Sequence, residues 1–249
     1  MDVAPEDKGE NVRREICLTL ERMGIFPESS HHESGPGQNE IDFRYADALT
    51  AADNAVMFRS VVRTIAAQNG LWADFSPRPL AGHDGNGMHI NFSAKRDGKV
   101  LPPLQLVPGL MRRIPEMTRL LNPIENSYAR LGRDKAPAYI TWSEENRSQL
   151  VRVPAAEGEF RRVELRSPDN AANPYLAFAL MIQACLEGIE EGLPLPEPTN
   201  LNLFRAEASK LRIYDRLPAT LAEATEYAAR SEFLRAHLPA QVLEGYGIR

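Results

Sequence analysis

The chain has 249 residues, of which 43% are hydrophobic, so it can bury a full core as one large domain or two small ones. Its formal net charge of −5 argues against a general nucleic-acid-binding protein. Cys17 and Cys185 lie in helical patterns without paired spacing, which argues against a disulfide framework or a zinc–thiolate site. No apolar run approaches the ~20 residues of a membrane span. The polar start MDVAPEDKGEN does not resemble a signal peptide, so we expect a cytoplasmic protein.

The first part of the chain predicts a helix, a turn, a strand and a second helix. Residues 11–23 repeat apolar side chains at helical spacing. Residues 40–45 alternate between charged and apolar side chains, which predicts a half-buried strand. The inner face of that strand carries Ile41, Phe43 and Tyr45. The Ala-rich residues 46–69 predict a long helix that Gly70 ends.

The rest of the chain mixes short strands with helices. Residues 75–87 read as a loop rich in Pro and Gly, and residues 88–93 alternate again. Helices are predicted at 108–122, at 169–192 with Asn173 as its cap, at 219–229 and at 231–237. Strands are predicted for AYITWS, SQLVRVP and RRVELRS. Because strands and helices do not alternate regularly, we expect an α+β fold with a curved, largely antiparallel sheet and helices on its outer face.

Three predicted strands carry a row of polar or ionisable groups on one face. Such a face cannot form an apolar core, so it meets water, pairs its charges or binds charged ligands. A single such strand is more often a surface strand. Three of them, each beside a glycine-rich or charged loop, favour a binding site. The rows consist of Glu40; of His89, Asn91 and Ser93; and of Arg162, Glu164 and Arg166.

The segment HHESGPGQNEIDF can likewise be interpreted either as exposed surface or as part of a binding site. Glu33 and Glu40 stand seven residues apart across a Gly-Pro-Gly hinge. One interpretation is a surface loop with incidental charge. The other is a turn that folds back, so that the two carboxylates meet and need a cation between them.

Five segments together resemble the catalytic domain of type I glutamine synthetase, in that family's order and near its spacing. They are SHHESGPGQNEIDF, GNGMHINFS, NSYARL, NRSQLVRVP and RRVELRSPDNAANPYLAFALMIQACLEGI. The resemblance covers about residues 3–200 and, more weakly, the rest. It implies a glutamine synthetase/guanido kinase-like catalytic domain. We expect residues 1–249 to be a single fragment of that domain, without the family's small N-terminal β-domain and first catalytic strand.

The resemblance implies two sites for Mg²⁺ or Mn²⁺. Glu33 and Glu40 belong to the first, and His89 and Glu164 to the second. Oxygen-rich sites with one imidazole suit these ions. The family's third ligand for each site comes from an acidic E-x-E segment of the first catalytic strand. Residues 1–30 contain no such segment, so we expect each site to be one carboxylate short.

The implied reaction is phosphoryl transfer from ATP to the γ-carboxylate of glutamate, followed by attack of ammonia on the acyl phosphate. The resemblance assigns glutamate binding to Gly85, Arg130 and Arg166. It assigns Arg147 and Arg152 to the transferring phosphoryl group. The nucleotide side is assigned to Tyr45, Asn91, Ser93, Arg152 and Arg162.

The chain departs from the family at four positions. The family has Asn where this chain has Asp84, a histidine where it has Asn91, and a regulatory tyrosine where it has Phe204. The family's flap carries a glutamate that deprotonates ammonium. Here the flap reads GRDKAP, with Lys135 at that place and Asp134 as the only nearby substitute.

These departures leave three hypotheses open. The chain is a fragment of a glutamate–ammonia ligase and is inactive by itself, or it belongs to a γ-glutamyl-amine ligase that uses another amine, or it is a non-catalytic relative with a structural or nucleotide-binding role. The resemblance also implies a homo-oligomer in the full-length protein, which we expect to be weakened in this fragment. We expect no nucleic-acid or membrane partner.

Overall fold

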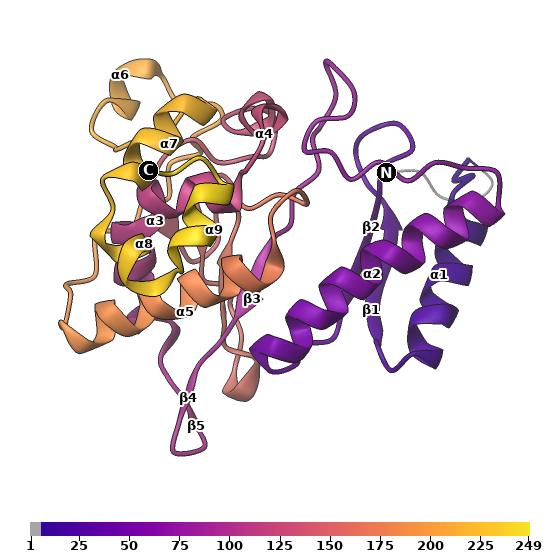
Figure 1. Cartoon of the computed structure of the whole chain (residues 1–249), viewed down its shortest axis with the longest axis horizontal. Helices are drawn as coiled ribbons and strands as arrows, with labels where there is room; N and C mark the ends of the chain where they lie inside the picture. The colour runs from indigo at the N-terminus through magenta and orange to yellow at the C-terminus, as the bar shows by residue number, and fades with distance from the viewer. Residues whose placement is uncertain (1–5) are drawn as a thin grey trace. The chain divides into compact units, whose positions relative to one another are not determined.

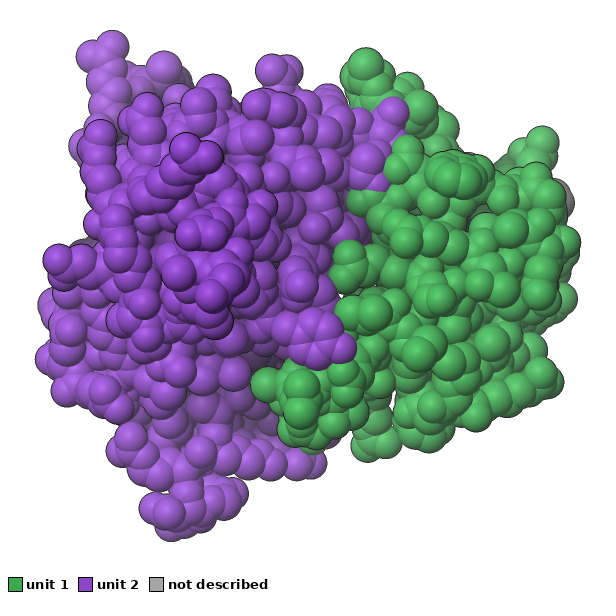
Figure 2. Space-filling model, in the orientation of Figure 1, with its two compact units in different colours: residues 1–75, 80–84 green, residues 76–79, 85–249 purple. Residues whose placement is uncertain are grey.

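The computed structural model describes residues 6–249, and residues 1–5 of the polar start lie outside the described residues. The chain forms two compact units. The first contains residues 1–75 and 80–84, and the second contains residues 76–79 and 85–249 (Figure 2). A single domain over the whole chain stays a prediction.

The first unit pairs two helices with a two-stranded antiparallel sheet. Its elements are α1 (Glu10–Arg22), β1 (Pro27–His32), β2 (Asn39–Phe43) and α2 (Ala48–Gln68). Both helices lie where the sequence predicts them, and Asp47 caps α2 by accepting a hydrogen bond from the Thr50 amide at 3.1 Å. Strand β1 is not predicted, because its residues PESSHH show no apolar alternation.

The core of the first unit forms between α1 and α2. It contains Ile16, Leu20, Ile25, Val61 and Ile65, with Ile41 and Phe43 packed against it. The expected inner face of β2 is therefore correct for those two residues. It is wrong for Tyr45, which is 61% exposed because the strand already ends at Phe43.

The second unit contains a four-stranded sheet in the order β3-β8-β7-β6. The strands are β3 (Ile90–Phe92), β6 (Trp142–Ser143), β7 (Val151–Arg152) and β8 (Val163–Leu165). All neighbours are antiparallel except β6 and β7, which are parallel. Each strand occurs where the sequence predicts one but is shorter. A separate hairpin, β4 (Lys95–Arg96) and β5 (Lys99–Val100), extends from this unit (Figure 1).

The mixture of helices and largely antiparallel strands confirms the α+β class. The three polar rows, however, lie on two sheets. Glu40 belongs to β2, which forms a two-stranded sheet with β1 in the described part of the chain, whereas Asn91 and Glu164 face each other across β3 and β8. Local pairing of β1 with β2 through a short turn explains why Glu40 joins a sheet of its own.

The second unit contains most of the helices. They are η1 (Pro103–Gln105), α3 (Val107–Leu121), α4 (Glu125–Arg130), η2 (Gly158–Phe160), α5 (Pro174–Glu190), α6 (Ala208–Leu211), α7 (Leu221–Ala229), α8 (Glu232–His237) and α9 (Ala240–Gly245). Asn173 caps α5 as predicted. The sequence does not predict α4, α6 and α9, which contain only four to six residues each. Within residues 6–249, no helix has the length and apolarity that a membrane crossing needs.

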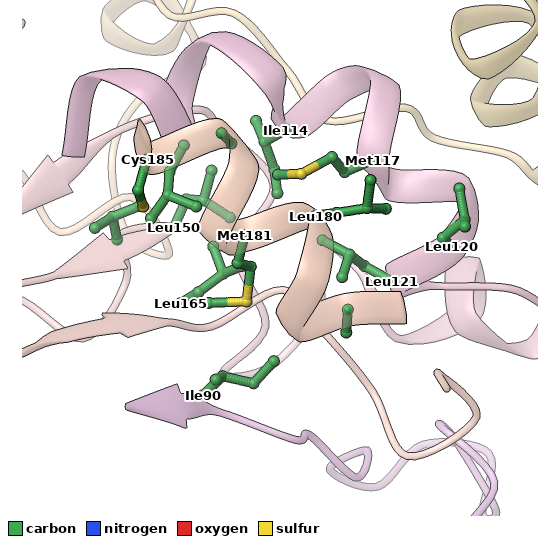
Figure 3. Close-up of a cluster of buried hydrophobic side chains, with 14 of the residues drawn as sticks. Ile90, Ile114, Met117, Leu120, Leu121, Leu150, Leu165, Leu180, Met181 and Cys185 are labelled. Carbon is green, nitrogen blue, oxygen red and sulfur yellow. The ribbon is translucent and has the colours of Figure 1, made fainter. Parts of the chain in front are cut away.

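Helices α3 and α5 pack directly on each other and cover the sheet. Figure 3 shows Ile114 and Met117 of α3 beside Leu180 and Met181 of α5, with Leu165 of the sheet nearby. The two helices approach closely at Gly109, where a Cβ atom would lie 1.9 Å from the main-chain oxygen of Ala184. This packing fixes the sheet whose polar face carries the candidate site.

Candidate functional site

The β1–β2 turn brings one histidine and two glutamates together. His31 pairs with Glu40 in the strand register. The Glu33 amide donates to the Gln38 carbonyl at 2.8 Å, and the Gly35 amide donates to the Gln38 side chain at 2.9 Å, which closes the turn. The turn therefore folds back, and the carboxylates of Glu33 and Glu40 lie on the same part of it.

The donor set of this turn fits a divalent cation. His31, Glu33 and Glu40 each offer one ligand atom, and these atoms all lie within 4.8 Å of one another. Nε2 of His31 is 3.3 Å from Oε1 of Glu33. One imidazole and two carboxylates suit Mn²⁺ or Mg²⁺. That the group binds a metal stays a prediction.

His31 was not among the residues predicted for this site. The residue lies two positions before Glu33, so in an extended segment both side chains point to the same face. That spacing could have identified His31, but β1 carries no apolar alternation that would reveal it as a strand.

The second predicted pair, His89 and Glu164, also lies close together, within the second unit. Nδ1 of His89 is 3.4 Å from Oε1 of Glu164. The same oxygen accepts a hydrogen bond from Nη1 of Arg166 at 2.8 Å, and Oε2 accepts one from Nε of Arg152. Glu164 and Arg166 are each only 4% exposed. A buried carboxylate is thus held by two guanidinium groups, with one imidazole beside it.

Positive charge exceeds negative charge around Glu164. Burial lowers the pKa of Arg166, Glu164 opposes this shift, and the cations of Arg152 and Arg147 add to it. Arg147 is exposed. Nε of Arg166 is buried and has no hydrogen-bond partner among the described residues. The cluster is therefore suited to an anionic group that would accept from this donor.

Arg130 is a buried arginine, with 3% of its surface exposed. Burial lowers its pKa to about 10. Its guanidinium donates to the carbonyls of Ser167 at 2.8 Å and Arg166 at 3.2 Å. Gly85 and Gly87 allow this position, because a Cβ at Gly87 would lie 2.6 Å from Nη2 of Arg130. Gly85 thus lies against the side chain of Arg130, and both residues are predicted to bind glutamate.

The residues predicted on the nucleotide side are only partly brought together. Nε of Arg162 donates to Oδ1 of Asn91 at 3.1 Å, and Ser93 follows at the end of β3. Asn91 and Ser93 are exposed. Tyr45 belongs to the first unit, and the others belong to the second.

Asp134, the predicted substitute base, is held in an ion pair. Its Oδ2 lies 3.1 Å from Nη2 of Arg78, and its backbone has a φ of +54°. Arg78 also donates to the carbonyl of Ala129 at 2.9 Å. The carboxylate of Asp134 is therefore already engaged by a guanidinium group.

Comparison with protein families and curated proteins gives one consistent result. The family model described as "Glutamine synthetase, catalytic domain" matches residues 1–247. The glutamine synthetase of Methanosarcina mazei is 45% identical over an alignment of 260 residues, which covers 98% of this chain and 58% of that protein. The glutamine synthetase of Staphylococcus epidermidis is 48% identical over 236 residues, which covers 88% of this chain and 53% of that protein. The chain spans little more than half the length of these relatives.

Solved structures give a similar picture. The structure described as "GmaS/ADP complex-Conformation 1" has a TM-score of 0.85 at 30% identity, and the match covers 97% of this chain and 60% of that chain. A cryo-EM structure of Plasmodium falciparum glutamine synthetase has a TM-score of 0.86 at 22% identity, with 99% of this chain and 58% of that chain covered. The second match bears on the fold alone.

Proposed function

The chain belongs to the glutamine synthetase family, and on that premise we propose that it carries catalytic residues of an ATP-dependent ligase. The reaction joins ammonia to the γ-carboxylate of glutamate. That carboxylate attacks the terminal phosphorus of ATP, ADP leaves, and ammonia then displaces phosphate from γ-glutamyl phosphate.

Two groups of side chains would hold divalent cations, with Mg²⁺ or Mn²⁺ as the expected ions. His31, Glu33 and Glu40 form the first group, supported by their mutual distances. His89 and Glu164 belong to the second. When bound, such cations neutralise phosphate charge during the transfer. The presence of His31 in the first group means that an imidazole supplies a third ligand there.

The arginines would bind the anionic parts of the substrates. Arg166 has a buried Nε without a hydrogen-bond partner among residues 6–249, which supports its assignment to a substrate carboxylate. Arg152 and Arg147 would meet the transferring phosphoryl group, because both contribute positive charge beside Arg166. Arg162 would meet the nucleotide phosphates. Arg130 would contribute to glutamate binding through its cationic charge. It also holds the backbone next to Arg166 in place, because it donates to the carbonyls of Ser167 and Arg166.

The observation that carries the proposal is the buried Glu164, which contacts His89, Arg152 and Arg166 at once. The test is calorimetric binding of ADP in the presence of Mn²⁺; ADP is chosen because the similar GmaS structure is described as an ADP complex. We expect binding to weaken about tenfold or more in Glu164→Gln. Exposed Glu159→Gln serves as the matched control. An absence of nucleotide binding by the wild type, or equal binding by Glu164→Gln, would reject the proposal.

The ion pair of Asp134 favours a second candidate, a γ-glutamyl-amine ligase that uses another amine. The carboxylate of Asp134 is paired with Arg78 instead of being open to an incoming ammonium ion, and Lys135 cannot act as a carboxylate base in its place. ADP release should be measured with glutamate and either ammonia or a panel of primary amines. Release only with an amine other than ammonia supports the second candidate. Nucleotide binding without release in any mixture supports the non-catalytic relative.

Self-association is also part of the proposal. The family resemblance implies that the full-length protein is a homo-oligomer, with ATP, glutamate and an amine as its small-molecule partners. Sedimentation velocity of the full-length protein tests this directly. A single monomeric boundary over the accessible concentration range would contradict it.

A further inference from the structure

The turn that follows β8 is held from two sides. The carbonyl of Ser167 accepts hydrogen bonds from Nη1 of Arg130 at 2.8 Å and from Nδ2 of Asn122 at 2.9 Å. Nη2 of Arg130 also donates to the carbonyl of Arg166. The backbone that carries Arg166 out of the sheet is therefore fixed by two side chains from outside the strand.

Asn122 and Asp169 connect this turn to the end of α3. Both are fully buried, with 0% exposure. Nδ2 of Asn122 donates to Oδ2 of Asp169 at 2.8 Å, and Oδ1 of Asp169 accepts from the Ala171 amide at 3.0 Å. Asn122 is the residue at which α3 ends, and the Asp169 amide donates to the carbonyl of Leu121 at 3.3 Å. A shift of either side chain would move the turn relative to α3.

Arg130 lies near one negative charge, Asp169, and one positive charge, Arg166. Asp169 attracts the buried cation of Arg130, whereas the cation of Arg166 repels it. Glu164 neutralises Arg166 from the sheet side. Two guanidinium groups that lie close together in a buried site repel each other, and a nearby anion for each of them reduces that cost. Asp169 supplies the anion for Arg130.

We propose that Asn122 and Asp169 are positioning residues, which hold Arg130 and the turn carrying Arg166 in the arrangement that the anionic amino-acid substrate needs. Neither residue is predicted to touch the substrate. The inference rests on the proposed function, because it takes Arg130 and Arg166 as the groups that bind glutamate.

The test compares two binding reactions and the stability of the same variants. Asp169→Asn keeps the shape of the side chain but removes its charge, and Asn122→Ala removes the donor to Ser167. Asp215→Asn, at an exposed position, is the matched control. Calorimetry measures glutamate binding and, separately, ADP binding with Mn²⁺, and a thermal melt reports folding. We expect glutamate binding to weaken about tenfold in both variants, since hydrogen bonds to charged groups are typically lost at that cost, with ADP binding unchanged.

A purely structural role gives a different result. Glutamate and ADP binding would then fall together, in step with the melting temperature, and the inference would be overturned. Glutamate binding equal to that of wild type in both folded variants would overturn it as well.

A second readout tests the positioning role without any ligand. It decides the case in which the wild type binds neither glutamate nor ADP, a result that would reject the proposed function but would not by itself test the positioning role. The side-chain Nε and Nη resonances of ¹⁵N-labelled arginine report how firmly Arg130 is held. We expect slow rotation of its guanidinium in wild type and fast rotation in Asp169→Asn and Asn122→Ala, with Asp215→Asn unchanged. Identical rotation in all four proteins would contradict the positioning role.

Discussion

His31 and Glu40 face each other across the antiparallel β1–β2 pair, and Glu33 reaches back to His31 with a separation of 3.3 Å between Nε2 and Oε1. Strand register thus brings Glu40 to His31, nine positions earlier, whereas Glu33 lies only two positions after His31. Because register in a short hairpin is fixed by its turn, a change in the turn would separate His31 from Glu40 without altering either residue.

Because α3 and α5 approach each other closely at Gly109, we expect Gly109→Ala to destabilise the protein. The added Cβ would lie 1.9 Å from the main-chain oxygen of Ala184, so the helices must separate. We expect a loss of about 1–3 kcal/mol in the free energy of unfolding, measured by urea denaturation. At Gly245, an exposed glycine at the end of α9, a Cβ would meet nothing within 4 Å. Gly245→Ala should not destabilise the protein, and equal losses for the two variants would contradict the packing argument.

A buried ion pair predicts how the protein responds to acid. Two nitrogens of Arg13 donate to the carboxylate of Asp7, and Arg13 also binds Ser30 of β1 and Asn39 of β2. The hydrogen bonds from Arg13 lower the pKa of Asp7 below its ordinary value of 3.8. This contribution to stability is therefore present above pH 3.8 and is lost as the pH falls through the lowered pKa.

The matching experiment is denaturant unfolding of Asp7→Asn and wild type across this pH range. Asp7→Asn should be less stable at neutral pH, and its stability should converge with that of wild type in acid. Glu21→Gln, exposed in the last turn of α1, should follow wild type throughout. A constant difference between Asp7→Asn and wild type down to the lowest pH would show that the charge of Asp7 does not matter.

The two cysteines should differ in reactivity. Burial raises the pKa of Cys185 to about 12, and its Sγ donates to the carbonyl of Leu106. Cys17 is only partly buried. With a chromogenic disulfide reagent, we expect Cys17 to react in the native protein and Cys185 only after unfolding. The Cys17→Ser variant should then show no rapid phase; a rapid phase in that variant would contradict the burial of Cys185.

The ion pair between Asp134 and Arg78 should restrain the loop after α4. Asp134→Asn removes the charge at a backbone φ of +54°, and Asp97→Asn does the same at an exposed φ of +52° in the β4–β5 hairpin. Because asparagine tolerates this conformation, the pair of variants isolates the ion pair. Hydrogen exchange in residues 131–136 should accelerate in Asp134→Asn by the equivalent of about 0.2–1 kcal/mol. Unchanged exchange, or the same acceleration in Asp97→Asn, would show that the pair does not restrain the loop.

The long helices and the positions of the strands in the four-stranded sheet could be predicted from the sequence, because apolar periodicity, helix caps and glycine stops mark them. The pattern at 108–122 gives α3 (Val107–Leu121) almost residue for residue. The strands of the four-stranded sheet were predicted too long, since alternation continues beyond the residues that find a pairing partner. Strand β1 and helix α4 have no apolar period to detect.

The candidate site could be predicted only where a local sequence pattern marks its residues. The turn pointed to Glu33 and Glu40, whereas His31 becomes visible only when β1 is known to be a strand. The partners of Glu164 depend on pairing of β8 with β7, which places Arg152 opposite it. Asn122 and Asp169 lie 47 positions apart, and no local pattern connects them.

Titration with Mn²⁺ followed by electron paramagnetic resonance tests whether His31, Glu33 and Glu40 together hold a divalent cation. The wild type should bind Mn²⁺, and Glu40→Gln and His31→Ala should each weaken that binding about tenfold or more. Glu28→Gln, exposed on the same strand as His31, should bind as the wild type does. Affinities of Glu40→Gln and His31→Ala equal to that of Glu28→Gln would contradict the proposed metal site.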